Sequence, residues 1–213
     1  MKRNIIKLIN IRIWILAIAA CLAVQAASAQ VRPPLSFNFN YSIAQPLGSV
    51  KDYSDKTSFR GWQAGLQYML NDQLGVGLKS GFQDFYYKAP RAVYPTKSGD
   101  ISAVQTRTLQ VIPVLATVQY QFTKPDAIVI PYASLGVGVA NMNYEKYWGM
   151  FVDKDNSWQF MASPEIGINI PFGKASPLLF NASVQYNYSP YKLAEITNFS
   201  TVQGNIGLRW HIN

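Results

Sequence analysis

Cysteine, charge and long apolar runs are all scarce in this sequence, and each scarcity excludes something. The only cysteine, Cys21, lies inside an amino-terminal segment with the features of an export signal, so its removal would leave a mature chain without disulfides or thiol chemistry. The segment Ile18-Ala19-Ala20-Cys21 also resembles a lipoprotein cleavage box, and lipidation of Cys21 is the alternative. Only 14% of the residues are charged, against roughly 25% in soluble domains, which is too little for a sheet that faces water.

Residues 1–29 predict a secretory signal peptide, followed by one domain over residues 30–213. A basic start leads into an apolar run over residues 13–24 and then into the small-residue cleavage site Ala27-Ser28-Ala29. The run has about 12 residues, short of the roughly 20 that a membrane-spanning helix needs, and no later segment comes near that length without a break. If the mature chain crosses a membrane, it must therefore do so as strands.

The net charge of +8 depends partly on the leader. Without the four basic residues of the leader, 15 basic side chains remain against 11 acidic ones. These positive charges are scattered along the chain and form no basic stripe, so we expect no nucleic-acid partner.

From about residue 35 the sequence alternates apolar and small polar side chains with period two, which predicts strands and an all-β fold. Charged residues fall mainly in the connectors between these segments. Eight strands are predicted, over residues 35–44, 59–70, 74–87, 107–122, 128–144, 158–170, 178–188 and 199–212.

The connectors alternate long and short along the chain. Residues 88–105 and 145–157 are predicted as long polar connectors, and residues 71–73 as a tight turn. Short turns on the periplasmic side and longer loops outside the cell are typical of transmembrane barrels. The pattern therefore predicts an eight-stranded antiparallel transmembrane β-barrel with both termini on the periplasmic side.

The period of two shows that each strand has an apolar and a polar face, but it does not show which face points inward. The opposite arrangement is a soluble lipocalin-like barrel, with an apolar interior and a polar exterior. Two features favour the membrane barrel. The polar face carries Gly, Ser, Asn and Gln rather than the charged mixture of a water-exposed sheet. Aromatic residues mark the ends of the apolar face, as in the girdles at membrane interfaces. These are Trp62 and Tyr188 toward the outside, and Tyr68, Tyr120, Phe122 and Trp210 toward the periplasm.

The chain resembles the small outer-membrane β-barrel proteins of Gram-negative bacteria, also described as outer membrane protein beta-barrel domain or porin-family proteins. The resemblance spans residues 31–213 and implies the cell outer membrane as location, contact with its lipids and lipopolysaccharide, and assembly by the barrel-assembly machinery. Such proteins commonly end on an aromatic residue, whereas Trp210 stands three residues before the end of this chain. The segments that carry the resemblance are Tyr41-Ser42-Ile43-Ala44-Gln45-Pro46-Leu47-Gly48, Thr57-Ser58-Phe59-Arg60-Gly61-Trp62, Pro131-Tyr132-Ala133-Ser134-Leu135-Gly136-Val137-Gly138 and Gly207-Leu208-Arg209-Trp210-His211-Ile212-Asn213.

Three charges lie on the polar face: Lys79, Glu165 and Arg209. Each lies about four to six residues from the periplasmic end of its strand, so all three are expected at a similar depth in the lumen. A buried carboxylate without a partner would be costly. We therefore predict an ion-pair cluster that fills the interior of a narrow barrel, with a gate or proton path as the functional alternative.

Candidates for chemistry are few. His211 is the only histidine, and its place near the carboxyl terminus puts it at the periplasmic rim, away from outer-leaflet lipid. Asp153, Asp155 and Asn156 form a short acidic segment without the glycine and terminal glutamate of a calcium loop, so a solvated turn is expected there. The sequence thus predicts no catalytic residue, no metal and no cofactor.

The function expected from these features is a non-enzymatic structural or surface-interaction role, with an unidentified partner at the cell surface. One alternative is a narrow channel for small apolar or amphipathic solutes. A second alternative, from another class, is a barrel enzyme that modifies lipid A, which would need a nucleophile, a base and an orienting acid together.

Overall fold

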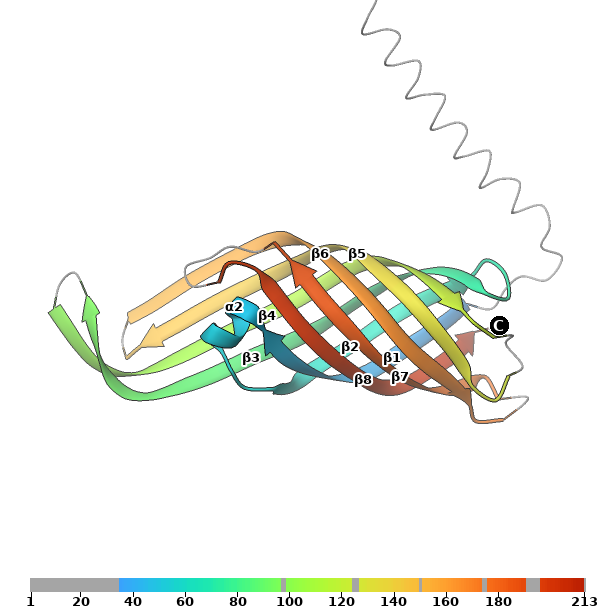
Figure 1. The fold of residues 1–213 in the computed structure, drawn as a ribbon, viewed down its shortest axis with the longest axis horizontal. Coiled ribbons are helices and arrows are strands. Elements are labelled where there is room, and N and C mark those ends of the chain that lie inside the picture. Colours follow the sequence, from blue (N-terminus) through green and yellow to red (C-terminus); the bar gives the residue numbers. More distant parts are fainter. Residues whose placement is uncertain are drawn as a thin grey trace, which may run out of the picture. The chain divides into compact units, whose positions relative to one another are not determined.

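Eight antiparallel strands close into a barrel in which each strand pairs with its sequence neighbours and the first pairs with the last (Figure 1). The computed structural model describes residues 35–96, 99–123, 127–149, 151–173, 176–190 and 196–212, all within one compact unit, Pro34–Asn213. The predicted signal peptide and Cys21 lie outside the described residues. The expected all-β fold with eight antiparallel strands is confirmed.

The strands differ widely in length, from 12 to 23 residues. Between the first two strands lies a short helix, α2. No helix among the described residues is long and apolar enough to span a membrane. In chain order the elements are β1 (Leu35–Leu47), α2 (Gly48–Tyr53), β2 (Ser58–Met69), β3 (Leu74–Thr96), β4 (Gly99–Gln121), β5 (Ile130–Trp148), β6 (Phe151–Pro171), β7 (Leu178–Ser189) and β8 (Phe199–Ile212).

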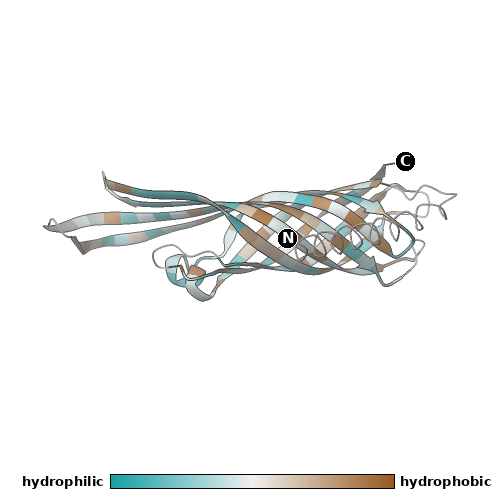
Figure 2. Cartoon of the chain, turned by 90° about the horizontal axis from the view of Figure 1, so that it is seen from above, coloured by the Kyte–Doolittle hydropathy of each residue, from teal (hydrophilic) through white to brown (hydrophobic). Residues whose placement is uncertain are grey.

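Alternation along each strand sends apolar side chains outward and polar side chains into the lumen. In β2, Leu66 and Tyr68 are 46% and 41% exposed, whereas Gln63 and Gln67 are buried. The same alternation gives the banded colouring of the barrel wall in Figure 2. The barrel is thus inverted relative to a soluble one, as lipid outside and side-chain packing inside require.

The strand ends define two different ends of the barrel. Leu35 pairs with both Tyr68 and Ile212, so the start of β1 and the end of β8 lie side by side. The tight turn after β2 lies at this end, and Asn71 Oδ1 accepts hydrogen bonds from the backbone N–H groups of Gln73 and Leu74 at 2.9 and 2.7 Å. This Asx-type turn explains why residues 71–73 reverse the chain so tightly.

The other end carries long hairpins, and here the prediction of a connector over residues 88–105 is wrong. β3 and β4 continue as a paired hairpin as far as Thr96 and Gly99. Figures 1 and 2 show this hairpin reaching well beyond the barrel wall. Pro90 and Pro95 are typical of a loop, but proline, which has no backbone N–H, is tolerated on an edge strand because no neighbouring strand needs that donor.

The predicted connector over residues 145–157 is wrong for a related reason. β5 runs to Trp148 and β6 starts at Phe151, so the expected solvated turn at Asp153 and Asp155 is strand. In this register Glu145 lies opposite Lys154, and Lys146 lies opposite Asp153. Opposite charges directly across two strands stabilise the pairing, so charge here marks a water-exposed hairpin rather than a loop.

The lumen is apolar at the hairpin end, a feature that the sequence pattern did not predict. α2 contributes Val50 and Tyr53 to a buried cluster with inward side chains of several strands. Arg107 donates to the carbonyl oxygens of Asp52 and Tyr53, which are otherwise free at the end of the helix. The rest of the cluster is Ala44, Phe85, Leu109, Val111, Leu115, Ala140, Met142, Tyr144, Met161, Ile196 and Phe199.

Candidate functional site

The structure brings two of the three predicted lumen charges into direct contact. Lys79 Nζ of β3 lies 2.7 Å from Glu165 Oε2 of β6, with both side chains buried. Lys79 also donates to Gln185 Oε1 at 2.8 Å, and the Tyr132 hydroxyl donates to Glu165 Oε1 at 2.7 Å. Both oxygens of the carboxylate therefore have partners, which offsets much of the cost of burying it.

Arg209, the third predicted member, is held differently. Its Nη2 donates to Gln119 Oε1 at 2.9 Å, and its guanidinium lies over the ring of Tyr132, 5.4 Å from the centroid. It forms no ion pair with any carboxylate in the described part of the chain, and its Nε has no partner there. Tyr132 contacts both Glu165 and Arg209, so the three charges lie in one region of the lumen. Only Lys79 and Glu165 form an ion pair.

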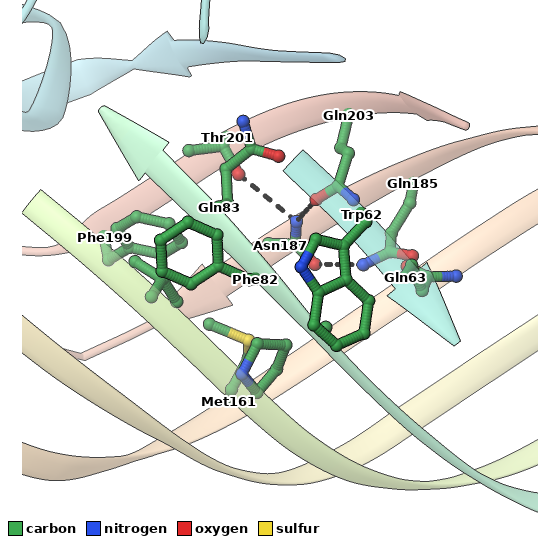
Figure 3. Close-up of a pocket in the computed structure, with 13 residues that line it drawn as sticks. Trp62, Gln63, Phe82, Gln83, Met161, Gln185, Asn187, Phe199, Thr201 and Gln203 are labelled. Carbon is green, nitrogen blue, oxygen red and sulfur yellow. Dashed lines mark hydrogen bonds between the residues drawn. The ribbon is translucent and has the colours of Figure 1, made fainter. Parts of the chain in front are cut away.

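An amide network fills the lumen above these charges. Asn187 donates to Gln203 Oε1 at 2.9 Å and to Thr201 Oγ1 at 3.3 Å, and its Oδ1 accepts from Gln185 (Figure 3). Gln203 donates in turn to Asn205 Oδ1 at 2.9 Å. In the sequence, these amides stand at alternate positions of β7 and β8. Period two predicts that they share a polar face, but it does not predict their hydrogen bonds.

A small cavity of about 20 Å³, open to solvent in part, lies where the amide network meets the apolar cluster. Figure 3 shows Met161 and Phe199 on one side and the amides on the other. The pairing of β3 with β4 is interrupted at Gly81 and Phe82, opposite Pro113, and resumes in the same register at Gln83. Proline supplies no N–H to the ladder, which explains the interruption beside the cavity.

The six aromatic residues of the predicted girdles all lie on the outward face. Their exposed fractions run from 39% for Tyr188 to 58% for Phe122. Tyr120 and Phe122 are in edge-to-face contact with ring centroids 5.4 Å apart, and Trp62 stacks on Phe39 at 6.0 Å. The remaining members are Tyr68 and Trp210.

His211 lies near the end of β8, opposite Ser36 at the start of β1. This is the end of the barrel away from the long hairpins. The described residues contain no group of three His, Cys, Asp or Glu side chains that could hold a metal ion. The structure therefore adds no catalytic or metal-site candidate to those considered from the sequence.

The four long strands form a sheet beyond the rim, and it holds its own electrostatic contacts. Lys154 Nζ donates to Glu145 Oε1 at 2.9 Å, and the Tyr147 hydroxyl donates to Glu145 Oε2 at 2.7 Å. The hydrogen bonds from Lys154 and Tyr147 lower the pKa of the Glu145 carboxyl below its usual value. Beyond Gln83, β3 has no pairing with β2, and before Ala162, β6 has none with β7 among the described residues.

Similar proteins share this architecture. Neisserial surface protein A is 16% identical, with 84% of this chain and 96% of that protein covered at a TM-score of 0.55. Ail, the attachment invasion locus protein of Yersinia pestis, solved in complex with the heparin analogue sucrose octasulfate, is 15% identical, with 85% and 98% covered at a TM-score of 0.50. Identity at this level shows the common fold alone. The comparison with curated proteins gave no match.

A family model matches the sequence of this chain directly. The model described as outer membrane protein beta-barrel domain matches residues 13–211, which is nearly the whole chain. The apolar outer wall, the closed polar lumen and the unequal ends described above are those of such a barrel. The chain therefore belongs to the outer membrane protein beta-barrel domain family, and it is a protein of the bacterial outer membrane.

Proposed function

We propose that this protein is a non-enzymatic outer-membrane barrel whose protruding sheet binds another protein at the cell surface. The observation that carries the proposal is the free edge of β6 over residues 151–161. There β6 pairs with β5 on one side, while its pairing with β7 begins only at Ala162. A strand edge with unpaired N–H and C=O groups is where proteins add an extended peptide as a further strand.

The opposite edge of the same sheet supports the choice of β6. β3 also has a free edge beyond Gln83, but Pro90 and Pro95 remove two backbone donors from this stretch. A register shift between Ala89 and Ala92 disturbs it further. Proline and bulges are two of the devices that protect strand edges from pairing, and charge is another, which β6 carries at Asp153, Lys154 and Asp155. Residues 151–161 contain no proline and no such shift, so within the part of the chain that the structure describes the β6 edge is less protected than the β3 edge and has no neighbouring strand.

Side chains along β6 supply contacts for an added strand. Val152, Trp158 and Phe160 are separated by even numbers of positions, so they lie on one face of the strand. They are 47%, 60% and 51% exposed. Large aromatic side chains are the commonest anchors of protein interfaces. The partner that fits is an extended protein segment with apolar side chains at alternate positions.

Two matched cysteine variants test this proposal, because the mature chain expected after signal cleavage has no cysteine. Val152→Cys lies on the open β6 edge and Val93→Cys on the protected β3 edge, with both valines exposed. Each variant, carrying a photo-crosslinker on intact cells, would be exposed to the proteins of the cell's natural surroundings. We expect a defined adduct from Val152→Cys that disappears when Trp158 is also changed to Ala. Equal adducts from both edges, or none from either, would contradict the proposal.

A second candidate function is the slow passage of small amphipathic solutes. It is favoured by the cavity beside Pro113, where apolar and amide side chains meet next to an interrupted strand ladder. The lumen of an eight-stranded barrel is otherwise filled by side chains, so any flux should be small. Conductance and solute uptake in vesicles carrying the purified protein would test it, and Pro113→Ala, which restores the ladder donor, should reduce uptake.

A further inference from the structure

The buried charges of the lumen do not balance. Lys79 and Glu165 neutralise each other at 2.7 Å, and Arg209 is left as a cation that is only 4% exposed. An arginine side chain stays protonated in proteins, so deprotonation cannot remove this charge. A buried charge without a counter-ion is strongly unfavourable, and the close contacts of Arg209 are the neutral oxygen of Gln119 and the face of the Tyr132 ring.

Hydrogen-bond donors without partners collect around this cation. Arg209 Nε, Gln119 Nε2 and Gln67 Nε2 are buried and have no acceptor within the described residues. The orientation of Gln119 follows from its contact with Arg209, because only its oxygen can accept the guanidinium N–H at 2.9 Å. Its amide N–H₂ must then point elsewhere and stays free.

The residues that carry these three donors line one small polar cavity of about 20 Å³, partly open to solvent, which has room for about one water-sized group. Lys79 lines it as well, and two of its three N–H donors are engaged, with Glu165 and Gln185. Glu165 is the one carboxylate among the lining residues, and its two oxygens already accept from Lys79 and Tyr132. The cavity therefore offers surplus donors and a surplus positive charge.

We propose that this cavity binds a small monovalent anion, held by Arg209 Nε and Gln119 Nε2 with support from Gln67 Nε2. A single negative charge would bring the buried cluster to neutrality, whereas a divalent anion would overcompensate it beside Glu165. A halide fits this requirement, since it accepts hydrogen bonds from several directions. The site is independent of the proposed role of β6.

The test is a urea titration of the protein refolded in lipid vesicles, since guanidinium chloride would itself supply a halide. Sodium bromide is compared with sodium gluconate, an anion too large for the cavity, at equal ionic strength. We expect bromide to raise the urea midpoint in a saturable way. At about nine times its dissociation constant, bromide should lower the unfolding equilibrium constant about tenfold.

Three variants separate the site from general salt effects. Arg209→Met removes the cation, and Gln119→Glu supplies a built-in counter-ion, so both should fold and lose the response to bromide. Gln121→Glu adds the same charge one inward position further along β4, outside the cavity lining, and should keep the response. Equal midpoints in bromide and gluconate, or a response that survives in Gln119→Glu, would overturn the proposal. An anomalous bromide peak beside Arg209 in a crystal would support it directly.

Discussion

Removing one partner of the buried lumen pair should destabilise the barrel far more than removing both. Lys79→Met leaves the Glu165 carboxylate about 6% exposed in the lumen, with only the Tyr132 hydroxyl and weaker contacts to stabilise it. Breaking a buried pair in this way costs about 3–5 kcal/mol, because the remaining charge loses its hydrogen-bonded counter-ion without regaining water. Arg209 is held on Gln119 and Tyr132 and forms no ion pair with Glu165 in the described part of the chain. We therefore expect Lys79→Met to lower the free energy of unfolding by about 3–5 kcal/mol.

The double variant Lys79→Met with Glu165→Gln gives the control. Replacing both charges leaves the net charge of the cluster unchanged, and the introduced amide oxygen can still accept from Tyr132, so the loss should be within about 1 kcal/mol of zero. The assay is reversible urea unfolding in lipid vesicles, followed by tryptophan fluorescence. A Lys79→Met loss below about 1 kcal/mol, or a double variant as unstable as the two single variants combined, would refute the reasoning.

Three further outcomes follow from the structure. Leu66→Arg, on the outward face near mid-strand, should cost roughly 2–4 kcal/mol in a refolding titration if it lies at the bilayer midplane, and Gln67→Ala should cost less. His211→Ala should leave lipid A unchanged by mass spectrometry at normal barrel levels; a lost lipid modification would favour the enzyme alternative. The pKa of Glu145 is lowered in the folded protein, so its pair with Lys154 stabilises the hairpin fully above the usual carboxyl pKa of roughly 4.3. This stabilisation is lost as the pH falls through the lowered pKa. Amide exchange in β5 and β6 beyond the rim, corrected for the intrinsic pH dependence of exchange, should therefore show less protection near pH 3 than near pH 6, and a flat protection profile would contradict this.

Much of the barrel could be predicted from the sequence because lipid imposes one simple rule on every strand. Side chains alternate between an apolar outside and a polar inside, so segments such as Leu178–Ser189 show their bounds within a residue. The rule fails beyond the membrane, where both faces of a strand meet water. The prediction of connectors over residues 88–105 and 145–157 is wrong because proline and charge replace the alternation there, although cross-strand pairs hold these residues as hairpins.

The interior was predictable only in part, for a reason of geometry. The inward direction of Lys79, Glu165 and Arg209 follows from period two, but their pairing depends on the stagger between strands that are far apart in sequence. The same holds for the apolar cluster, since Val50 and Tyr53 enter the lumen on a six-residue helix too short to give a periodic signal. The free donors of Arg209 and Gln119 are visible only once the packing is known.

Thiol labelling from outside intact cells tests the central claim most directly, namely that the barrel spans the outer membrane with the β3–β6 sheet at the cell surface. Val152→Cys lies at the tip of that sheet, and Phe172→Cys lies in a short turn at the opposite end; both positions are exposed. A membrane-impermeant maleimide should label Val152→Cys on intact cells and Phe172→Cys only after the outer membrane is permeabilised. The reverse pattern, or equal labelling of both positions on intact cells, would contradict the account.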